Sequence, residues 1–295
     1  MDISLITKNN NKSPHHGSAT QRMVLPSLLQ EKLPRGRVLY RTLAKDYRQF
    51  YYLYLPRAKY SRTSLLVSIH GIKRMAKEHI DAFSIFAERY GVALAVPVFP
   101  ADRFSDYQRL GVSEKSLRAD RALHDILEEV SMLTAINTDQ LFMFGYSGGG
   151  QFVHRYAMAY PERVNRIVVA ASGWYTFPDL NLKYPYGIAS TRKISGRAFD
   201  PVRFLTVPSC VVVGEKDIHR DSELRKGKNI DKQQGRNRLE RGKSWIRVMS
   251  KCAETYHLDT EFDFQVLPAS GHSFLNCIQH GGMGEIVFEF LFSDQ

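Results

Sequence analysis

Hydrophobic residues follow two alternating patterns along most of the chain. Short, continuous apolar runs predict buried strands, and stripes of helical period between them predict amphipathic helices. The predicted strands are 37–43, 49–55, 64–70, 92–99, 140–144, 166–171, 208–214 and 261–267. The predicted helices are 77–90, one that begins at Ser113, 148–160, 236–257 and 284–292. This alternation predicts an α/β fold: a mostly parallel sheet of about eight strands, with helices on both faces and an antiparallel N-terminal edge.

The second predicted helix begins in a polar cluster. Ser113, Glu114 and Ser116 are residue types that cap helix N-termini, and an apolar stripe that runs from Leu117 to Val130 predicts the buried face. We therefore expect this helix to start at Ser113 and to pack Leu117 against the sheet.

Two segments lack a regular period. Residues 1–34 are polar and mixed, and we expect a flexible start with a short helix at 21–32. Residues 173–205 are rich in Tyr, Pro and Gly, and they form an insertion between the sixth and seventh predicted strands. The rest of the pattern is continuous and shows no internal repeat, so we expect one domain over 35–295.

The net charge of +11, from 41 Lys and Arg against 30 Asp and Glu, is compatible with nucleic acid, an anionic membrane or an acidic substrate. No nucleic-acid motif accompanies the charge, so we expect a basic surface and no nucleic-acid partner. The densest basic segment is 220–243, which acidic residues partly neutralise. A charge run of this kind is usually a solvated face.

The sequence also favours a cytoplasmic location. Its apolar runs are strand-sized and shorter than the roughly 20 residues of a membrane span. The N-terminus has no basic start followed by an apolar stretch, so we expect no secretory signal and no membrane span. Cys210, Cys252 and Cys277 are odd in number and far apart, which predicts neither a disulfide framework nor a metal site.

Candidate chemistry begins at the loop after the fifth predicted strand. Residues 145–149 read Gly-Tyr-Ser-Gly-Gly, which matches G-x-S-x-G between a strand and a helix. A sharp turn there would expose the Ser147 hydroxyl, and Gly145 and Gly149 would allow the backbone to approach closely. The Gly148 N–H would point toward a developing negative oxygen at the helix N-terminus. The alternative is a glycine-rich turn with no catalytic role.

A second loop gives the motif a specific resemblance. The third predicted strand ends in His70-Gly71-Ile72, which resembles the oxyanion loop of α/β-hydrolases. The resemblance implies that the Ile72 N–H pairs with the Gly148 N–H as oxyanion donors and that His70 holds the loop by hydrogen bonds. Residues 160–164, Tyr-Pro-Glu-Arg-Val, are also common in this superfamily.

The same resemblance supplies an acid and a base. Residues 214–217, Gly-Glu-Lys-Asp, follow the seventh predicted strand and place Asp217 at the family's acid position, with Glu215 and Asp221 as rivals. His272 follows the last predicted strand after a glycine, in the family's chain order of Ser, Asp and His. The likeness covers about residues 36–292 and is closest to esterases and polyhydroxybutyrate-depolymerase-like members.

The resemblance implies a serine hydrolase that cleaves a carboxylic ester by a Ser-His-Asp triad through an acyl-enzyme, with no metal and no cofactor. A thioesterase and an amidase or peptidase would use the same triad, and a non-catalytic binding protein on this fold is a further alternative. We expect a small-molecule ester or acyl substrate, anionic if the 220–243 segment reaches the pocket rim.

Aromatic residues are the candidates for the substrate pocket. The expected lining residues are Trp174, Tyr175 and Tyr146, and the further aromatics of the insertion are Phe177, Tyr184, Tyr186 and Phe199. The alternative is that the insertion is a packed loop held together by its own aromatic side chains.

Overall fold

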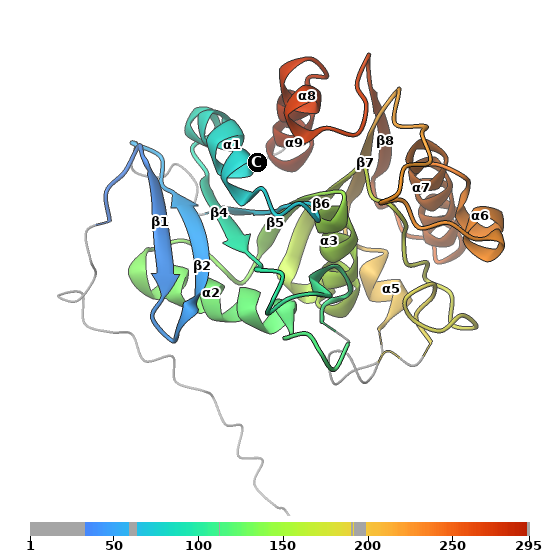
Figure 1. Cartoon of the computed structure of the whole chain (residues 1–295), viewed down its shortest axis with the longest axis horizontal. Helices are drawn as coiled ribbons and strands as arrows, with labels where there is room; N and C mark the ends of the chain where they lie inside the picture. Colours follow the sequence, from blue (N-terminus) through green and yellow to red (C-terminus); the bar gives the residue numbers. More distant parts are fainter. Residues whose placement is uncertain (1–32, 59–63, 112, 190, 192–198, 294–295) are drawn as a thin grey trace, which may run out of the picture. The chain divides into compact units, whose positions relative to one another are not determined.

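A single eight-stranded sheet organises the computed structural model, which describes residues 33–58, 64–111, 113–189, 191 and 199–293 (Figure 1). The spatial order is β1-β2-β4-β3-β5-β6-β7-β8. β2 pairs antiparallel with both β1 and β4, and every later pair is parallel. The strands are β1 (Val38–Leu43), β2 (Asp46–Tyr54), β3 (Leu65–Ile69), β4 (Ala93–Val98), β5 (Leu141–Tyr146), β6 (Val164–Ala170), β7 (Ser209–Gly214) and β8 (Phe262–Leu267).

Helices cover both faces of this sheet (Figure 1). Residues of α1, α8 and α9 share one apolar cluster with the sheet, and residues of α2, α3 and α7 share the other. The α-helices are α1 (Ala76–Tyr90), α2 (Ala119–Leu133), α3 (Gly148–Ala159), α5 (Pro201–Phe204), α6 (Lys228–Gln234), α7 (Arg238–Thr255), α8 (Phe274–Gln279) and α9 (Met283–Phe292). Two 3-10 helices are η2 (Tyr107–Arg109) and η3 (Pro161–Arg163).

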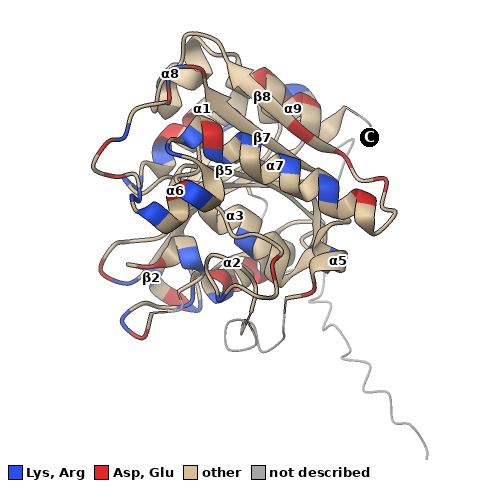
Figure 2. Cartoon of the chain, turned by 90° about the vertical axis from the view of Figure 1, so that its right-hand side faces the viewer, with Lys and Arg blue, Asp and Glu red and all other residues tan. Residues whose placement is uncertain are grey.

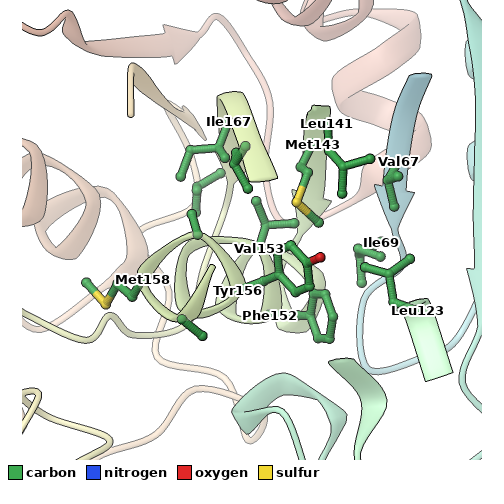
Figure 3. Packing of buried hydrophobic residues seen from close by; sticks show 14 of the residues in the cluster. Val67, Ile69, Leu123, Leu141, Met143, Phe152, Val153, Tyr156, Met158 and Ile167 are labelled. Carbon is green, nitrogen blue, oxygen red and sulfur yellow. The ribbon is translucent and has the colours of Figure 1, made fainter. Parts of the chain in front are cut away.

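The central strands are continuous apolar runs because both of their faces are covered. All residues of β3, β5 and β7 are buried, whereas exposed and covered positions alternate in β1 at the edge of the sheet. Figure 3 shows Phe152, Val153 and Tyr156 of α3 packed beside side chains of β3 and β5. The helix that follows Ser147 is therefore anchored on the middle of the sheet.

Parallel pairing brings the ends of four strands to one edge. β3, β5, β6, β7 and β8 run in the same direction, so the segments after β3, β5, β7 and β8 leave from the same edge. In open α/β sheets, ligands bind outside these carboxyl ends.

The predicted fold class is confirmed: the sheet has eight strands, is mostly parallel and carries an antiparallel N-terminal pair. The predicted start of the second helix is wrong, because α2 begins at Ala119. Ser113 and Ser116 bond to Asp106 instead: its carboxylate accepts from the Ser113 N–H at 3.1 Å, and its N–H donates to Ser116 Oγ at 3.1 Å. These residues fold a loop before the helix and do not cap it.

Several local features differ from the sequence pattern. Leu117, expected in the buried stripe, is 48% exposed because it precedes the helix. The short helices α5, α6 and α8 were not predicted, since four to seven residues are too few to show a helical period. The predicted helix at 21–32 and most of the segment 1–34 lie outside the described residues. The domain boundary at 35 stays a prediction.

Candidate active site

Ser147 occupies a strained turn between β5 and α3. Its backbone has φ 55° and ψ −112°, a conformation that non-glycine residues rarely adopt. The Ser147 N–H donates to the Ala170 carbonyl at 2.7 Å, which ties the turn to the end of β6. The surrounding structure thus holds a serine in a costly conformation, as expected where the backbone serves to present a side chain.

The two motif glycines are needed for close backbone packing. A Cβ at Gly145 would lie 2.2 Å from the Gly149 carbonyl oxygen, and a Cβ at Gly149 would lie 2.0 Å from the Ile69 carbonyl oxygen. Both contacts are with backbone atoms, which cannot rotate away. The spacing of glycines two before and two after Ser147 therefore has the steric cause inferred from the sequence.

The structure brings Ser147, His272 and Asp217 together from three loops. His272 Nε2 lies 3.2 Å from Ser147 Oγ, and His272 Nδ1 lies 2.7 Å from Asp217 Oδ2. A carboxylate only accepts hydrogen bonds, so Nδ1 carries the proton of the neutral imidazole and Nε2 is free to accept one. Asp217 is buried in the turn after β7, where its N–H donates to the Gly214 carbonyl at 3.0 Å.

The rival carboxylates have other partners. Glu215 accepts a hydrogen bond from the Ala269 N–H at 3.0 Å and so fastens the His272 loop from outside. Asp221 binds Arg238, at 2.6 Å from Nη1 to Oδ2 and 3.1 Å from Nη2 to Oδ1. Of the three candidates only Asp217 is hydrogen-bonded to His272.

Arg238 is the residue near this chain of hydrogen bonds that sequence reasoning missed. Its Nη1 lies 3.3 Å from Asp217 Oδ1, and its side chain is almost fully buried. Hydrogen bonding by Arg238 lowers the pKa of Asp221 to about 2. In the sequence Arg238 is one of many cations in the 220–243 segment, so only the fold could single it out.

The loop after β3 is held beside Ser147 by a neutral histidine. His70 Nε2 accepts from the Phe99 N–H at 3.1 Å, and Nδ1 lies 2.9 Å from the Gly71 carbonyl oxygen, to which it donates. Burial lowers the pKa of His70 to about 4, so the ring is neutral at pH 7. The Tyr107 hydroxyl donates to the His70 carbonyl at 2.9 Å. His70 therefore has the contacts expected of a residue that holds the loop.

Ile72 and Gly148 face each other across the turn. A Cβ at Gly148 would lie 3.3 Å from the Ile72 nitrogen and 2.6 Å from the Tyr107 hydroxyl. Gly148 is the first residue of α3, so its N–H has no acceptor within the helix. The two backbone N–H groups expected as oxyanion donors are thus close neighbours.

A cavity of about 280 Å³ opens over Ser147 and His272. Tyr146, one of the expected pocket residues, lines it, and its ring stacks on the His272 imidazole with 5.4 Å between centroids. The 220–243 segment reaches this cavity through Glu223. The other lining residues are Gly71, Ile72, Lys73, Arg74, Met75, Glu78, His79, Ser273, Phe274 and Leu275.

Trp174 and Tyr175, also expected in the pocket, do not line this cavity. Tyr175 is fully buried and stacks on Trp245, with 5.2 Å between ring centroids. Trp174 lies against the guanidinium groups of Arg155 and Arg225, at 4.6 and 4.8 Å from its ring centroid. The insertion therefore uses these two aromatic side chains to pack against the body of the fold. Phe177 and Phe199 are buried in the core, and Tyr184 packs against it.

The basic segment divides into partly buried ion pairs and a cationic hollow. Arg241 and Arg220 bind Asp231 at 3.0 and 2.9 Å, so part of the charge is neutralised internally. Figure 2 shows Lys and Arg residues on both α6 and α7. The lining of a second hollow contains three cations and no carboxylate: Tyr186, Arg225, Lys226, Gly227, Lys228, Asn229 and Ile230.

No group of three or more His, Cys, Asp or Glu side chains gathers within the described ranges as a metal ion would require. None of the helices in the described part of the chain combines the length and apolar character that a membrane crossing needs. The three cysteines are free thiols, and those of Cys210 and Cys277 are buried.

The sheet order, the strained serine turn and the strand-end loops are those of the α/β-hydrolase fold, which this chain adopts. Solved structures agree. Poly(aspartic acid) hydrolase-1 from Sphingomonas sp. KT-1 is 25% identical, with a TM-score of 0.69 over 82% of this chain and 94% of that one. No protein-family model and no curated protein sequence matches the chain.

Two more distant structures share the fold. A poly(3-hydroxybutyrate) depolymerase from Bordetella parapertussis is 19% identical, with a TM-score of 0.67 over 88% of this chain and 89% of that one. An S-formylglutathione hydrolase from Agrobacterium tumefaciens is 13% identical, with a TM-score of 0.56 over 86% and 94%. These two likenesses show the fold alone, and hydrolase chemistry at the level of class is supported by the 25% identical neighbour, a poly(aspartic acid) hydrolase.

Proposed function

We propose that this protein is a serine hydrolase that cleaves carboxylic esters through an acyl-enzyme. One observation carries the proposal: a continuous hydrogen-bond chain from Asp217 through His272 to the strained Ser147, at 2.7 and 3.2 Å. A nucleophile, a base and a group that orients the base, each within hydrogen-bond reach of the next, form the arrangement that nucleophilic acyl transfer requires.

The reaction follows from the orientation of these groups. His272 Nε2 accepts the Ser147 proton as Oγ attacks the carbonyl carbon, and Asp217 stabilises the imidazolium that forms. The N–H groups of Gly148 and Ile72 stabilise the oxyanion. His272 then donates its proton to the leaving alcohol oxygen, which leaves Ser147 acylated. A water molecule, activated by the same imidazole, releases the acid and restores the serine.

The cavity supports a compact substrate with an apolar part. Its volume of about 280 Å³ is near the lower end of ligand pockets, which span roughly 300–1,000 Å³. Ile72, Met75 and Leu275 at its lining are exposed apolar side chains, and Lys73 is an exposed cation. We therefore expect a short acyl or alkyl group to be bound over Ser147, either as a small ester or as one unit of a polymer.

A second candidate is hydrolysis of amide bonds in an anionic polymer. The 25% identical structural neighbour is a poly(aspartic acid) hydrolase, and poly(aspartic acid) is a polyamide that carries carboxylates. The cationic hollow of Arg225, Lys226 and Lys228 is chemically suited to such side groups. Glu223, two residues from Arg225, lines the cavity over Ser147 and brings the two regions close in sequence.

The decisive experiment replaces the nucleophile. Ser147→Ala is expected to abolish hydrolysis of p-nitrophenyl esters and covalent labelling by a fluorophosphonate probe. The control is Ser273→Ala, which removes another hydroxyl at the same cavity and is expected to remain labelled. A wild-type protein that the probe does not label would refute the nucleophile assignment.

A substrate panel separates the alternatives that share this triad. Wild-type and Ser147→Ala proteins should be compared on esters, acyl thioesters, small amides and poly(aspartic acid). Ser147-dependent turnover that is highest on esters supports the main proposal. Turnover confined to poly(aspartic acid) supports the second candidate.

A further inference from the structure

The second oxygen of the candidate triad acid is bound to a buried arginine. Asp217 Oδ2 accepts from His272, and Asp217 Oδ1 lies 3.3 Å from Nη1 of Arg238. The side chains of Asp217 and Arg238 are each 1% exposed. Charges at such depth are poorly screened by solvent, so they act on the nearby imidazole more strongly than surface charges do.

A second carboxylate completes the arrangement. Asp221 accepts two hydrogen bonds from Arg238, and its side chain is 37% exposed. The pKa of Asp221 is lowered to about 2, mainly by hydrogen bonding to Arg238, with a further contribution from the charge of His272. Asp221, Arg238, Asp217 and protonated His272 thus form a row of charges that alternate in sign.

The two carboxylates fix the direction of the guanidinium. Arg238 begins α7, where the Asn237 side chain caps the helix by accepting from the Glu240 N–H at 2.9 Å. Arg238 Nε is buried and has no hydrogen-bond partner among the described residues. Every hydrogen bond that the structure gives Arg238's side chain therefore ends on Asp217 or Asp221.

Asp221 also connects this row to the cavity wall. Its Oδ1 accepts from the N–H groups of Glu223 and Leu224 at 2.9 and 2.8 Å. Glu223 lines the cavity over Ser147. The same arginine thus contacts the candidate triad acid and the residue that orders one wall of the cavity.

We propose that Arg238 is a positioning residue of the catalytic triad, which orients Asp217 and sets the pH at which Ser147 becomes reactive. The inference rests on the proposed function. A cation beside the Asp217–His272 pair repels a positive charge on the imidazole and weakens the attraction between that charge and the Asp217 carboxylate. Asp221 opposes this effect, since its negative charge partly neutralises Arg238.

Other groups near His272 stay constant in the test. The remaining charged side chains that line its cavity are Lys73, Arg74, Glu78 and Glu223. On the other side Tyr146 stacks on the ring, and the Cys277 thiol bonds to the Gly271 carbonyl at 3.5 Å. None of these is altered in the variants below.

The test measures the rate of fluorophosphonate labelling of Ser147 as a function of pH. Arg238→Gln removes the cation, and the acid limb of the profile is expected to move up by about one pH unit. Asp221→Asn removes the opposing anion, and the limb is expected to move down by about half a unit. Arg238→Lys keeps the charge but loses the two-pronged geometry, so the limb stays in place while the plateau rate falls.

Opposite shifts of the acid limb in Arg238→Gln and Asp221→Asn would indicate a charge effect. Loss of structure would instead lower the labelling rate in every variant without moving the limb. Identical acid limbs in the wild type, Arg238→Gln and Asp221→Asn would overturn the inference. If circular dichroism shows that Arg238→Gln is unfolded, the other two variants test the inference. A downward shift of the acid limb in Asp221→Asn with no shift in Arg238→Lys supports it, and an unshifted limb in Asp221→Asn overturns it. A wild type without labelling refutes the proposed function and this inference with it, whereas a labelled wild type tests the inference alone.

Discussion

The geometry around Gly148 allows the proposed oxyanion site to be tested by the addition of a single methyl group. In Gly148→Ala the new Cβ would lie 2.6 Å from the Tyr107 hydroxyl and 2.7 Å from Ile72 Cγ2. Ile72 is 39% exposed and can rotate away. Tyr107 cannot, because its ring is fully buried and its hydroxyl is bonded to the His70 carbonyl. The loop that carries the Ile72 N–H must therefore shift.

The expected cost is that of one oxyanion donor. Removal of such a donor typically reduces kcat by about 100- to 1,000-fold, or about 3–4 kcal/mol. We expect Gly148→Ala to lose activity in this range with little change in KM, because the donor acts on the transition state. The assay is steady-state hydrolysis of a p-nitrophenyl ester, with thermal unfolding to confirm that the variant folds.

Two further variants make the interpretation specific. Gly271→Ala adds a methyl next to His272, at a place where no atom outside the two adjacent residues lies within 4 Å, and it should retain activity. Tyr107→Phe removes the clashing oxygen, so the double variant with Gly148→Ala should recover part of the loss. Near wild-type activity in Gly148→Ala would refute the assigned oxyanion geometry.

Three other outcomes follow from the structure. Gly149→Ala should destabilise the fold by more than about 3 kcal/mol, because its Cβ would lie 2.0 Å from the Ile69 carbonyl oxygen and the backbone would have to move. Chemical denaturation measures this, and an unchanged denaturation midpoint would contradict it. Burial lowers the pKa of His70 from 6.5 to about 4, so this histidine binds its proton in the unfolded chain before it does so in the folded one as pH falls. The free energy of unfolding should therefore drop by about 3 kcal/mol between pH 6.5 and 4, and by less in His70→Asn. Denaturation curves of equal pH dependence in both proteins would refute that reasoning. Neutralising Arg225 and Lys226 together should raise KM for anionic esters only, and an equal rise for neutral esters would exclude a role in charge selection.

The sequence predicted the centre of the sheet well because the strands β3, β5 and β7 are buried on both faces. Buried parallel strands need continuous apolar runs, and such runs are visible without any knowledge of tertiary contacts. The start of α2 was misplaced because Ser113 and Ser116 have cap chemistry, whereas in the fold they bond to Asp106. Local propensity cannot show which long-range partner a polar side chain will find.

The candidate triad was predictable because each member follows a strand end, which gives position as well as residue type. The pocket was not. Trp174 and Tyr175 lie in an insertion without a period, and their packing on Arg155 and Trp245 depends on contacts far along the chain. Arg238 carried no signal at all, since a buried arginine and a solvated one look alike in a basic segment.

The four loops of the candidate site follow strands that are far apart in the sequence. Ser147 and His272 are separated by 125 residues, and the loops after β3 and β7 contribute the remaining groups. Non-local parallel pairings form late and slowly in folding. No fragment that ends before β8 contains both Ser147 and His272, so recovery of Ser147 labelling during refolding would report that the strands from β3 to β8 have come together. The rate at which Ser147 becomes reactive can therefore be used to follow the assembly of these strands.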